Sequence, residues 1–158
     1  MIGRAAVLVA LLAMAAASVL SVPICASPRA GEGIPFQVVG QGIQPLNYPH
    51  VVVFRNQEDW EASWRQINPL RTVPEVDFGR QVAILYRLGC RGSAGHSLAV
   101  DCLSIRGGTM YVDVTETQPG AGCMVPPTLT CPFVVISTIH WPHEVEANLR
   151  QVVKDCIP

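Results

Sequence analysis

The sequence predicts an α+β protein in which β-structure dominates. We expect an antiparallel curved sheet or small sandwich, with one amphipathic helix packed on it and a further helix at the C-terminus. Three observations carry this prediction: apolar and polar residues alternate between positions 97 and 117, a glycine pair interrupts that alternation, and one segment shows a helical stripe.

The central part of the chain is predicted to form four consecutive antiparallel strands, at 82–88, 97–105, 110–117 and 132–139. In the third, Met110, Val112 and Val114 fall on one face, because successive side chains of a strand point to opposite faces. Gly107-Gly108 indicates a two-residue hairpin turn, since glycine tolerates the positive φ that such turns need.

This polarity brings two glycine-rich loops together. If the Gly107 turn lies at one end of the strands, loops 89–96 and 118–127 must both lie at the other end. We call the surface formed by these two loops the rim, and predict that it contacts a partner, because loops on a rigid scaffold commonly carry recognition. The candidate contact residues are Arg91, Gly92, Ser93, Gly95, His96, Gly120, Gly122 and Met124.

The N-terminus has the pattern of a secretory signal peptide over residues 1–26. Arg4 precedes an apolar run from Ala5 to Leu20, and Ala26 suits the position before the cleavage site. A permanent membrane anchor is disfavoured because the run is shorter than the ~20 residues of a spanning helix. A lipid anchor at Cys25 is the other alternative. We expect an exported protein, periplasmic or extracellular, with an envelope lipoprotein as the less favoured case.

A short linker is predicted at 27–35, followed by a β-rich domain at 36–141. Brief strands are expected at 36–39 and 51–54, with Gly40-Gln41-Gly42 breaking the first. Asn56 is a plausible helix N-cap, with Asp59 three residues on. Two tryptophans, Trp60 and Trp64, then recur at helical spacing, and we assign them to the core rather than to a binding platform.

A second helix is predicted at 142–158. Trp141-Pro142 places a proline at an early helical position, and Val145, Leu149 and Val152 mark an apolar side. Lys154 lies near the end of this segment, as the helix dipole prefers.

Cysteine usage predicts disulfides. Of six cysteines, five would remain after cleavage at Ala26, so one would be free or bridge to another molecule. A bond between Cys123 and Cys131 could close the second loop, and Cys156 could tie the C-terminal helix to the sheet. The disulfide candidates are Cys90, Cys102, Cys123, Cys131 and Cys156. We expect no zinc site, because the Cys and His spacings are not the tight pairs of structural sites.

No catalytic constellation is evident, so we predict that the protein is not an enzyme and needs no cofactor. Ser93 is not in a G-x-S-x-G elbow, and no acid to orient His96 is apparent. Loop 89–95 lacks the lysine and following helix of a phosphate-binding loop. The formal net charge of −1 gives no reason to expect nucleic acid or an anionic membrane as partner.

The ordered motifs resemble the C-terminal domain of the protease complex subunit PrcB family. They are Glu58-Asp59-Trp60…Trp64, Val76-Asp77-Phe78, Gly89-x-Arg91-x-x-x-Gly95-x-Ser97, Thr115-Glu116-Thr117-x-Pro119-Gly120 and Thr130-x-Pro132. The resemblance implies an exported, non-catalytic domain named after a subunit of a bacterial protease complex. In such domains a tyrosine is expected where His96 stands, and a threonine and a glycine where Ser93 and Ala94 stand.

Two functional hypotheses follow. The first is an exported binding or assembly module, an accessory subunit whose partner is a protein such as an exported protease. The second is a secreted protease inhibitor, whose glycine-rich loops, stiffened by disulfides and by Pro126-Pro127, would enter a protease cleft.

Overall fold

The structure is a computed structural model that describes residues 33–44 and 49–156. Half of the described residues are in strands, in agreement with the predicted mostly-β fold class. The elements in chain order are β1 (Gln37–Ile43), β2 (Pro49–Phe54), α1 (Gln57–Ile67), β3 (Val82–Leu88), β4 (Ser97–Arg106), β5 (Thr109–Pro119), β6 (Pro132–Thr138) and β7 (Glu144–Lys154).

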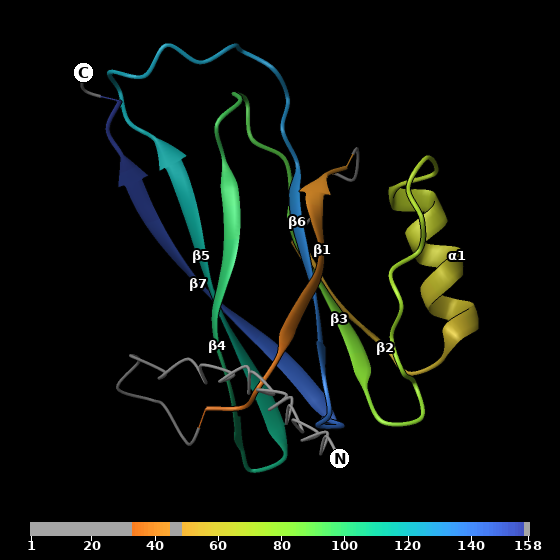
Figure 1. Cartoon of the computed structure of the whole chain (residues 1–158). Coiled ribbons are helices and arrows are strands. Elements are labelled where there is room, and N and C mark those ends of the chain that lie inside the picture. The colour runs from red at the N-terminus through yellow and green to blue at the C-terminus, as the bar shows by residue number, and fades with distance from the viewer. Residues whose placement is uncertain (1–32, 45–48, 157–158) are drawn as a thin grey trace, which may run out of the picture.

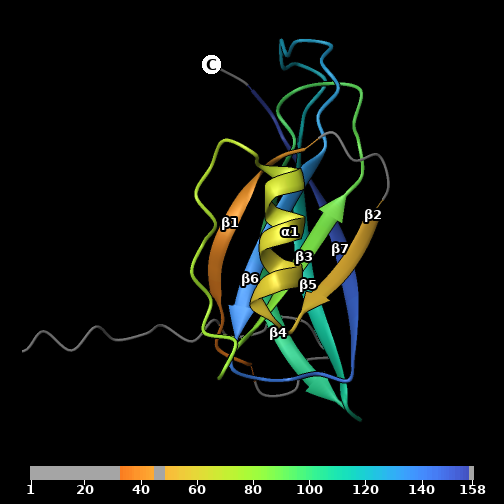
Figure 2. The same ribbon diagram turned by 90° about the vertical axis from the view of Figure 1, so that its right-hand side faces the viewer.

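The strands form two sheets, which lie in three layers with the helix (Figure 1). The first sheet has the order β1-β6-β3-β2 and is antiparallel throughout. The second has the order β4-β5-β7, with β4 antiparallel and β7 parallel to β5. Figure 2 shows α1 lying across the outer face of the first sheet, so that this sheet is the middle layer.

Strands β3 and β6 are buried on both faces because they occupy the centre of this middle layer. Every residue of both strands is buried. Ile84 and Ile136 pack toward the second sheet, whereas Leu85 and Val135 pack toward α1. A strand covered on both sides reads as a continuous apolar run rather than an alternating one, which is the pattern of 82–88.

The helix forms where the sequence predicts it. Asn56 caps it by accepting a hydrogen bond from the Asp59 N–H at 2.9 Å, and the Asn56 amide donates to the Asp59 carboxylate at 2.7 Å. Trp60 and Trp64 are buried, with ring centroids 5.2 Å apart, and Trp64 also contacts Phe133 of β6 edge-on. The prediction that both tryptophans belong to the core is confirmed.

The four predicted central strands are present as β3 to β6, but they are divided between two sheets. β3 pairs with β6 and β4 pairs with β5, so the chain leaves the first sheet after Leu88 and returns to it at Pro132. The Gly107-Gly108 turn has φ of 55° and 91° and joins β4 to β5 as predicted. Both rim loops are therefore crossovers between the sheets, at the end opposite that turn (Figure 1).

The prediction of a C-terminal helix at 142–158 is wrong. Residues Glu144–Lys154 form strand β7, which pairs with β5 along its whole length, from Thr109↔Glu144 to Pro119↔Lys154. Val145 and Ala147 pack on the core between the sheets, whereas most other residues of this edge strand are exposed. The local apolar spacing fits a helix, but backbone pairing with β5 determines the conformation.

Two predictions near the N-terminal end of the described residues are also corrected. The glycine segment expected to break the first strand continues it, because β1 runs to Ile43 with a register shift between Val38 and Gly40. The end of the predicted linker is part of the core: Ile34 is buried and its N–H donates to the Leu103 carbonyl at 2.9 Å.

The predicted signal peptide at 1–26 and most of the linker lie outside the described residues. Within the segments 33–44 and 49–156, no helix has the length and apolar character needed to cross a membrane.

Candidate functional site at the rim

The two rim loops lie side by side, as the sequence analysis predicts. The Ala94 N–H donates to the Pro126 carbonyl at 3.0 Å. At the base of the rim, Arg91 and Thr130 exchange backbone hydrogen bonds of 2.7 and 2.9 Å, which form one isolated bridge beyond the β3–β6 ladder. Loops that are far apart in sequence are thus joined by backbone contacts.

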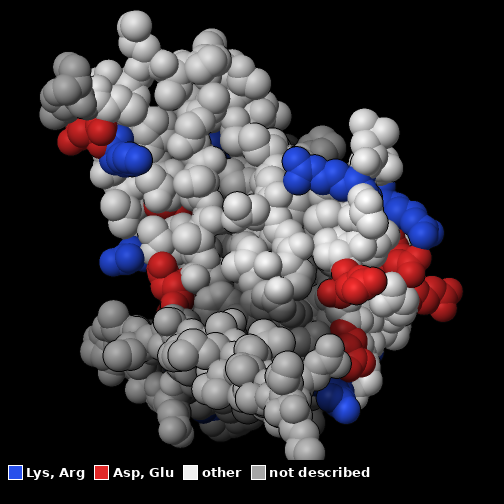
Figure 3. Space-filling view, viewed as in Figure 1, with Lys and Arg blue, Asp and Glu red and all other residues white. Residues whose placement is uncertain are grey.

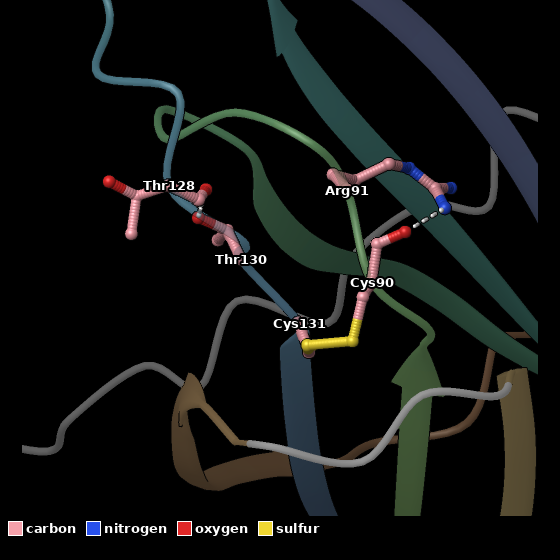
Figure 4. The surroundings of a disulfide bond; sticks show 5 residues. All are labelled: Cys90, Arg91, Thr128, Thr130 and Cys131. Carbon is pink, nitrogen blue, oxygen red and sulfur yellow. Dashed lines mark hydrogen bonds between the residues drawn. A yellow bond between two sulfur atoms is a disulfide. The ribbon is translucent and has the colours of Figure 1, made fainter.

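Two disulfides hold the rim. Cys90, just after β3, bonds to Cys131, just before β6, and the Arg91 side chain points away from this bond (Figure 4). Cys123 bonds to Cys156, which ties the tip of the second loop to the segment after β7. The expected Cys123–Cys131 closure is therefore wrong.

No described cysteine carries a free thiol, and Cys102 is disulfide-bonded as well. The sulfurs of all the described cysteines are accordingly unable to act as nucleophiles or as thiolate metal ligands. Groups of three or more His, Cys, Asp or Glu side chains that could hold a metal ion do not occur among the described residues.

A buried carboxylate lies under the rim. Glu116 of β5 has no exposed side-chain surface, and Arg91, 28% exposed, donates to its two oxygens from Nε and Nη2 at 2.8 and 2.9 Å. Gln151 of β7 donates to Glu116 Oε2 at 2.8 Å, and His96 Nδ1 lies 2.9 Å from Oε1. Three segments, namely loop 89–96, β5 and β7, therefore meet at the Glu116 side chain.

Burial alone would raise the pKa of Glu116, but hydrogen bonds from Arg91, Gln151 and His96, together with the charge of Arg91, lower this pKa to about 2. The hydrogen bond to Glu116 also raises the pKa of Arg91. Both groups are charged at neutral pH, so the pair is a buried salt bridge with its hydrogen bonds satisfied. Nearby, burial raises the pKa of Tyr86.

The structure also supplies the acid that the sequence analysis did not find for His96. Ser93 Oγ lies 3.3 Å from His96 Nε2, while His96 Nδ1 contacts Glu116. Serine, imidazole and carboxylate are thus connected in the order found in nucleophilic serine sites. The orienting acid that is not evident in the sequence is therefore Glu116.

The candidate contact residues fall into two groups. Gly92, Gly95, Gly122 and Met124 are exposed, and the Met124 side chain is fully so, at 102%. Gly120 is buried, and a Cβ added there would collide with Asp155. Arg91, Ser93 and His96 are partly buried, and their side chains are directed into the cluster around Glu116 or against one another.

Glu116 and Gln151 are the functional candidates that sequence reasoning missed. A signal for Glu116 exists: continuing the alternation of Val112 and Val114 places it on the core face of β5, where a carboxylate needs a partner. Gln151 could not be found, because its position opposite Glu116 depends on the parallel pairing of β7 with β5.

Charges of both signs lie on one face of the molecule (Figure 3). On the face shown in Figure 3, acidic and basic side chains are interspersed, mainly toward the margins, with uncharged surface between them. Among the described residues of the face in Figure 3 there is no single-sign patch of the kind that attracts nucleic acid.

Together, the fold and the site define a two-sheet β domain, covered by one helix, that presents two crossover loops clamped over a buried ion pair. The segment 83–138 matches the family model described as PrcB C-terminal, which confirms the family predicted from the sequence. The match extends from β3 to the end of β6 and so contains both rim loops. Searches of the curated proteins and of the solved structures found no match to the chain.

Proposed function

We propose that this protein is an exported protein-binding module, an accessory subunit of a protease complex, and that the rim is its contact surface. The supporting observation is that two loops from different parts of the chain are fixed side by side, with Met124 fully exposed at the tip. A preformed surface loses little conformational entropy on binding, which favours a specific contact.

Export is supported by the pattern at the N-terminus and by the disulfides. Cys90–Cys131 and Cys123–Cys156 both lie at the rim, and structural disulfides persist in oxidising compartments. The PrcB C-terminal match supports association with a protease complex, because it covers the segment that carries the rim.

Photo-crosslinking from the rim tests this proposal. A photoreactive amino acid replaces Met124, and in a matched control it replaces Leu70, which is 99% exposed in the turn after α1 and lies outside both rim loops. We expect a discrete adduct from position 124, absent from position 70, that mass spectrometry identifies as an exported protease or another subunit of its complex. Equal adducts from both positions, or none, would refute the proposal.

A secreted protease inhibitor is the second candidate, favoured by the surroundings of Met124. The Cys123–Cys156 disulfide precedes this side chain, Pro126-Pro127 follows it, and the Val125 N–H donates to the Cys123 carbonyl at 3.1 Å. A stiff loop with a fully exposed methionine side chain suits the specificity pocket of an endopeptidase. The test is a panel of papain-like and subtilisin-like proteases: inhibition at micromolar concentration, lost in Met124→Asp, is expected, and a panel without inhibition excludes this function.

A further inference from the structure

The hydrogen-bonded chain Ser93–His96–Glu116 carries an inference that is independent of the binding function. Ser93 Oγ is 3.3 Å from His96 Nε2, and His96 Nδ1 is 2.9 Å from Glu116 Oε1. A nucleophile, a base and an acid that orients the base are the three parts of an activated serine. Loop 89–96 provides the first two parts, and β5 provides the third.

The protonation states follow from the contacts. Glu116 has a pKa of about 2, so at neutral pH its oxygens only accept hydrogen bonds. His96 Nδ1 must therefore carry the hydrogen of this contact, and in the neutral ring Nε2 is left with its lone pair facing Ser93. This is the tautomer that can take the proton of the serine hydroxyl.

Arg91 fixes the position of the Glu116 carboxylate but also limits how strongly this carboxylate stabilises a protonated His96. Its guanidinium donates to both oxygens of Glu116 and balances the negative charge that would stabilise a protonated His96. Arg91 and Gln151 are positioning residues in this arrangement, since they hold Glu116 and do not contact Ser93. We therefore expect slow acylation rather than rapid turnover.

The loop leaves Ser93 reachable. Ser93 is partly exposed, Gly92 and Gly95 flank it, and a Cβ on Gly92 would meet nothing within 4 Å. Among the backbone contacts of the described residues, the N–H groups of Gly92, Ser93 and Gly95 have no acceptor.

We propose that Ser93 is an activated nucleophile that accepts an acyl group from small activated esters, or a phosphonyl group from a fluorophosphonate, whose P–F bond breaks to release fluoride. Ser93 Oγ attacks the carbonyl carbon while His96 Nε2 takes the hydroxyl proton. The ester C–O bond then breaks, the leaving alcohol carries away that proton, and an ester of Ser93 remains. Water attacks this ester with the same base, releasing the acid and restoring the serine.

Labelling of the full-length oxidised protein tests the proposal, with an alkyl fluorophosphonate and p-nitrophenyl acetate as probes. We expect one phosphonyl adduct, located at Ser93 by peptide mass spectrometry and absent from Ser93→Ala. Ser97→Ala is the matched control, because Ser97 is exposed at the start of β4, and it should label like the wild type. His96→Tyr should slow labelling at least about 100-fold, because a general base usually accelerates such a step by at least that factor.

The melting temperature of His96→Tyr keeps the test independent of folding, because an unchanged value would show that the variant is folded. Two outcomes would overturn the proposal. One is the absence of a Ser93 adduct under conditions that fully label a serine esterase. The other is an equal labelling rate in wild type and in folded His96→Tyr, which would indicate unassisted surface reactivity. Neither outcome affects the crosslinking expected from position 124.

Discussion

Replacing Glu116 by glutamine removes the charge under the rim while preserving the side-chain shape. The folded-state pKa is about 2 and the ordinary value is 4.5, a difference that corresponds to about 3 kcal/mol of stability at neutral pH. Removing one partner of a buried ion pair costs about 3–5 kcal/mol, and because Arg91 is 28% exposed we expect the lower end. Glu116→Gln should therefore be about 3 kcal/mol less stable at pH 7.

The pH dependence gives a second, independent signature. A carboxyl whose folded pKa is lowered stabilises the fold above its unfolded pKa, and this stabilisation is lost as the pH falls from about 4.5 toward 2. Between pH 7 and pH 3 the wild type should lose about 2 kcal/mol through this group alone. The stability difference between wild type and Glu116→Gln should shrink by that amount over the same interval.

Urea unfolding at pH 7 and pH 3 measures both effects. Glu61→Gln is the matched control, because Glu61 pairs with the 67% exposed Arg65 on the surface of α1 and should cost at most about 1 kcal/mol. The reasoning would be refuted if Glu116→Gln and Glu61→Gln had the same stability at pH 7, or if the effect of Glu116→Gln did not change with pH.

Two further predictions concern the disulfides and the packing of α1. Replacing both Cys90 and Cys131 by alanine removes a crosslink that spans a sequence separation of 41. From loop-closure entropy we expect the free energy of unfolding to fall by about 4 kcal/mol. Chemical denaturation measures this loss, and a change below about 1 kcal/mol would contradict the prediction. Gly40→Ala should destabilise by about 1–3 kcal/mol, because its Cβ would lie 2.8 Å from the buried Trp64 ring. Gly122→Ala, where a Cβ meets nothing within 4 Å, is its control in the same melting experiment, and equal melting temperatures would argue against close contact at Gly40.

The parts of the fold that the sequence predicts correctly are those set by local chemistry. Asn56 caps α1 through a contact three residues away, and Gly107-Gly108 adopts the positive φ that its turn requires. The apolar run 82–88 also forms the expected strand. Each of these signals lies within one element and does not depend on a distant partner.

The errors arise where a distant partner decides the structure. Val145, Leu149 and Val152 have helical spacing, yet β5 lies beside this segment and β7 completes its parallel ladder. The division of the four central strands into two sheets was missed for the same reason. Alternation shows which residues face inward, but it does not show which strands pair. The Cys123–Cys156 bond follows from the strand β7 and could not be found without it.

The candidate site shows the same pattern. The meeting of the two loops was predictable, because strand direction alone places them at one end. The Glu116 cluster was not found, since it combines β5, loop 89–96 and β7 at a single carboxylate. A serine and a histidine three residues apart in the sequence form a candidate nucleophile and base only when this carboxylate contacts the histidine.

Amide hydrogen exchange of the oxidised protein tests most directly whether the rim is a single rigid surface. The amides of Arg91, Ala94 and Thr130 donate to carbonyls at 2.7–3.0 Å, whereas the Gly92 amide has no backbone acceptor among the described residues and serves as the internal reference. We predict that the first three exchange at least about 100-fold more slowly than Gly92, because they open only when the rim separates. Exchange of all four amides at the unprotected rate would contradict the account.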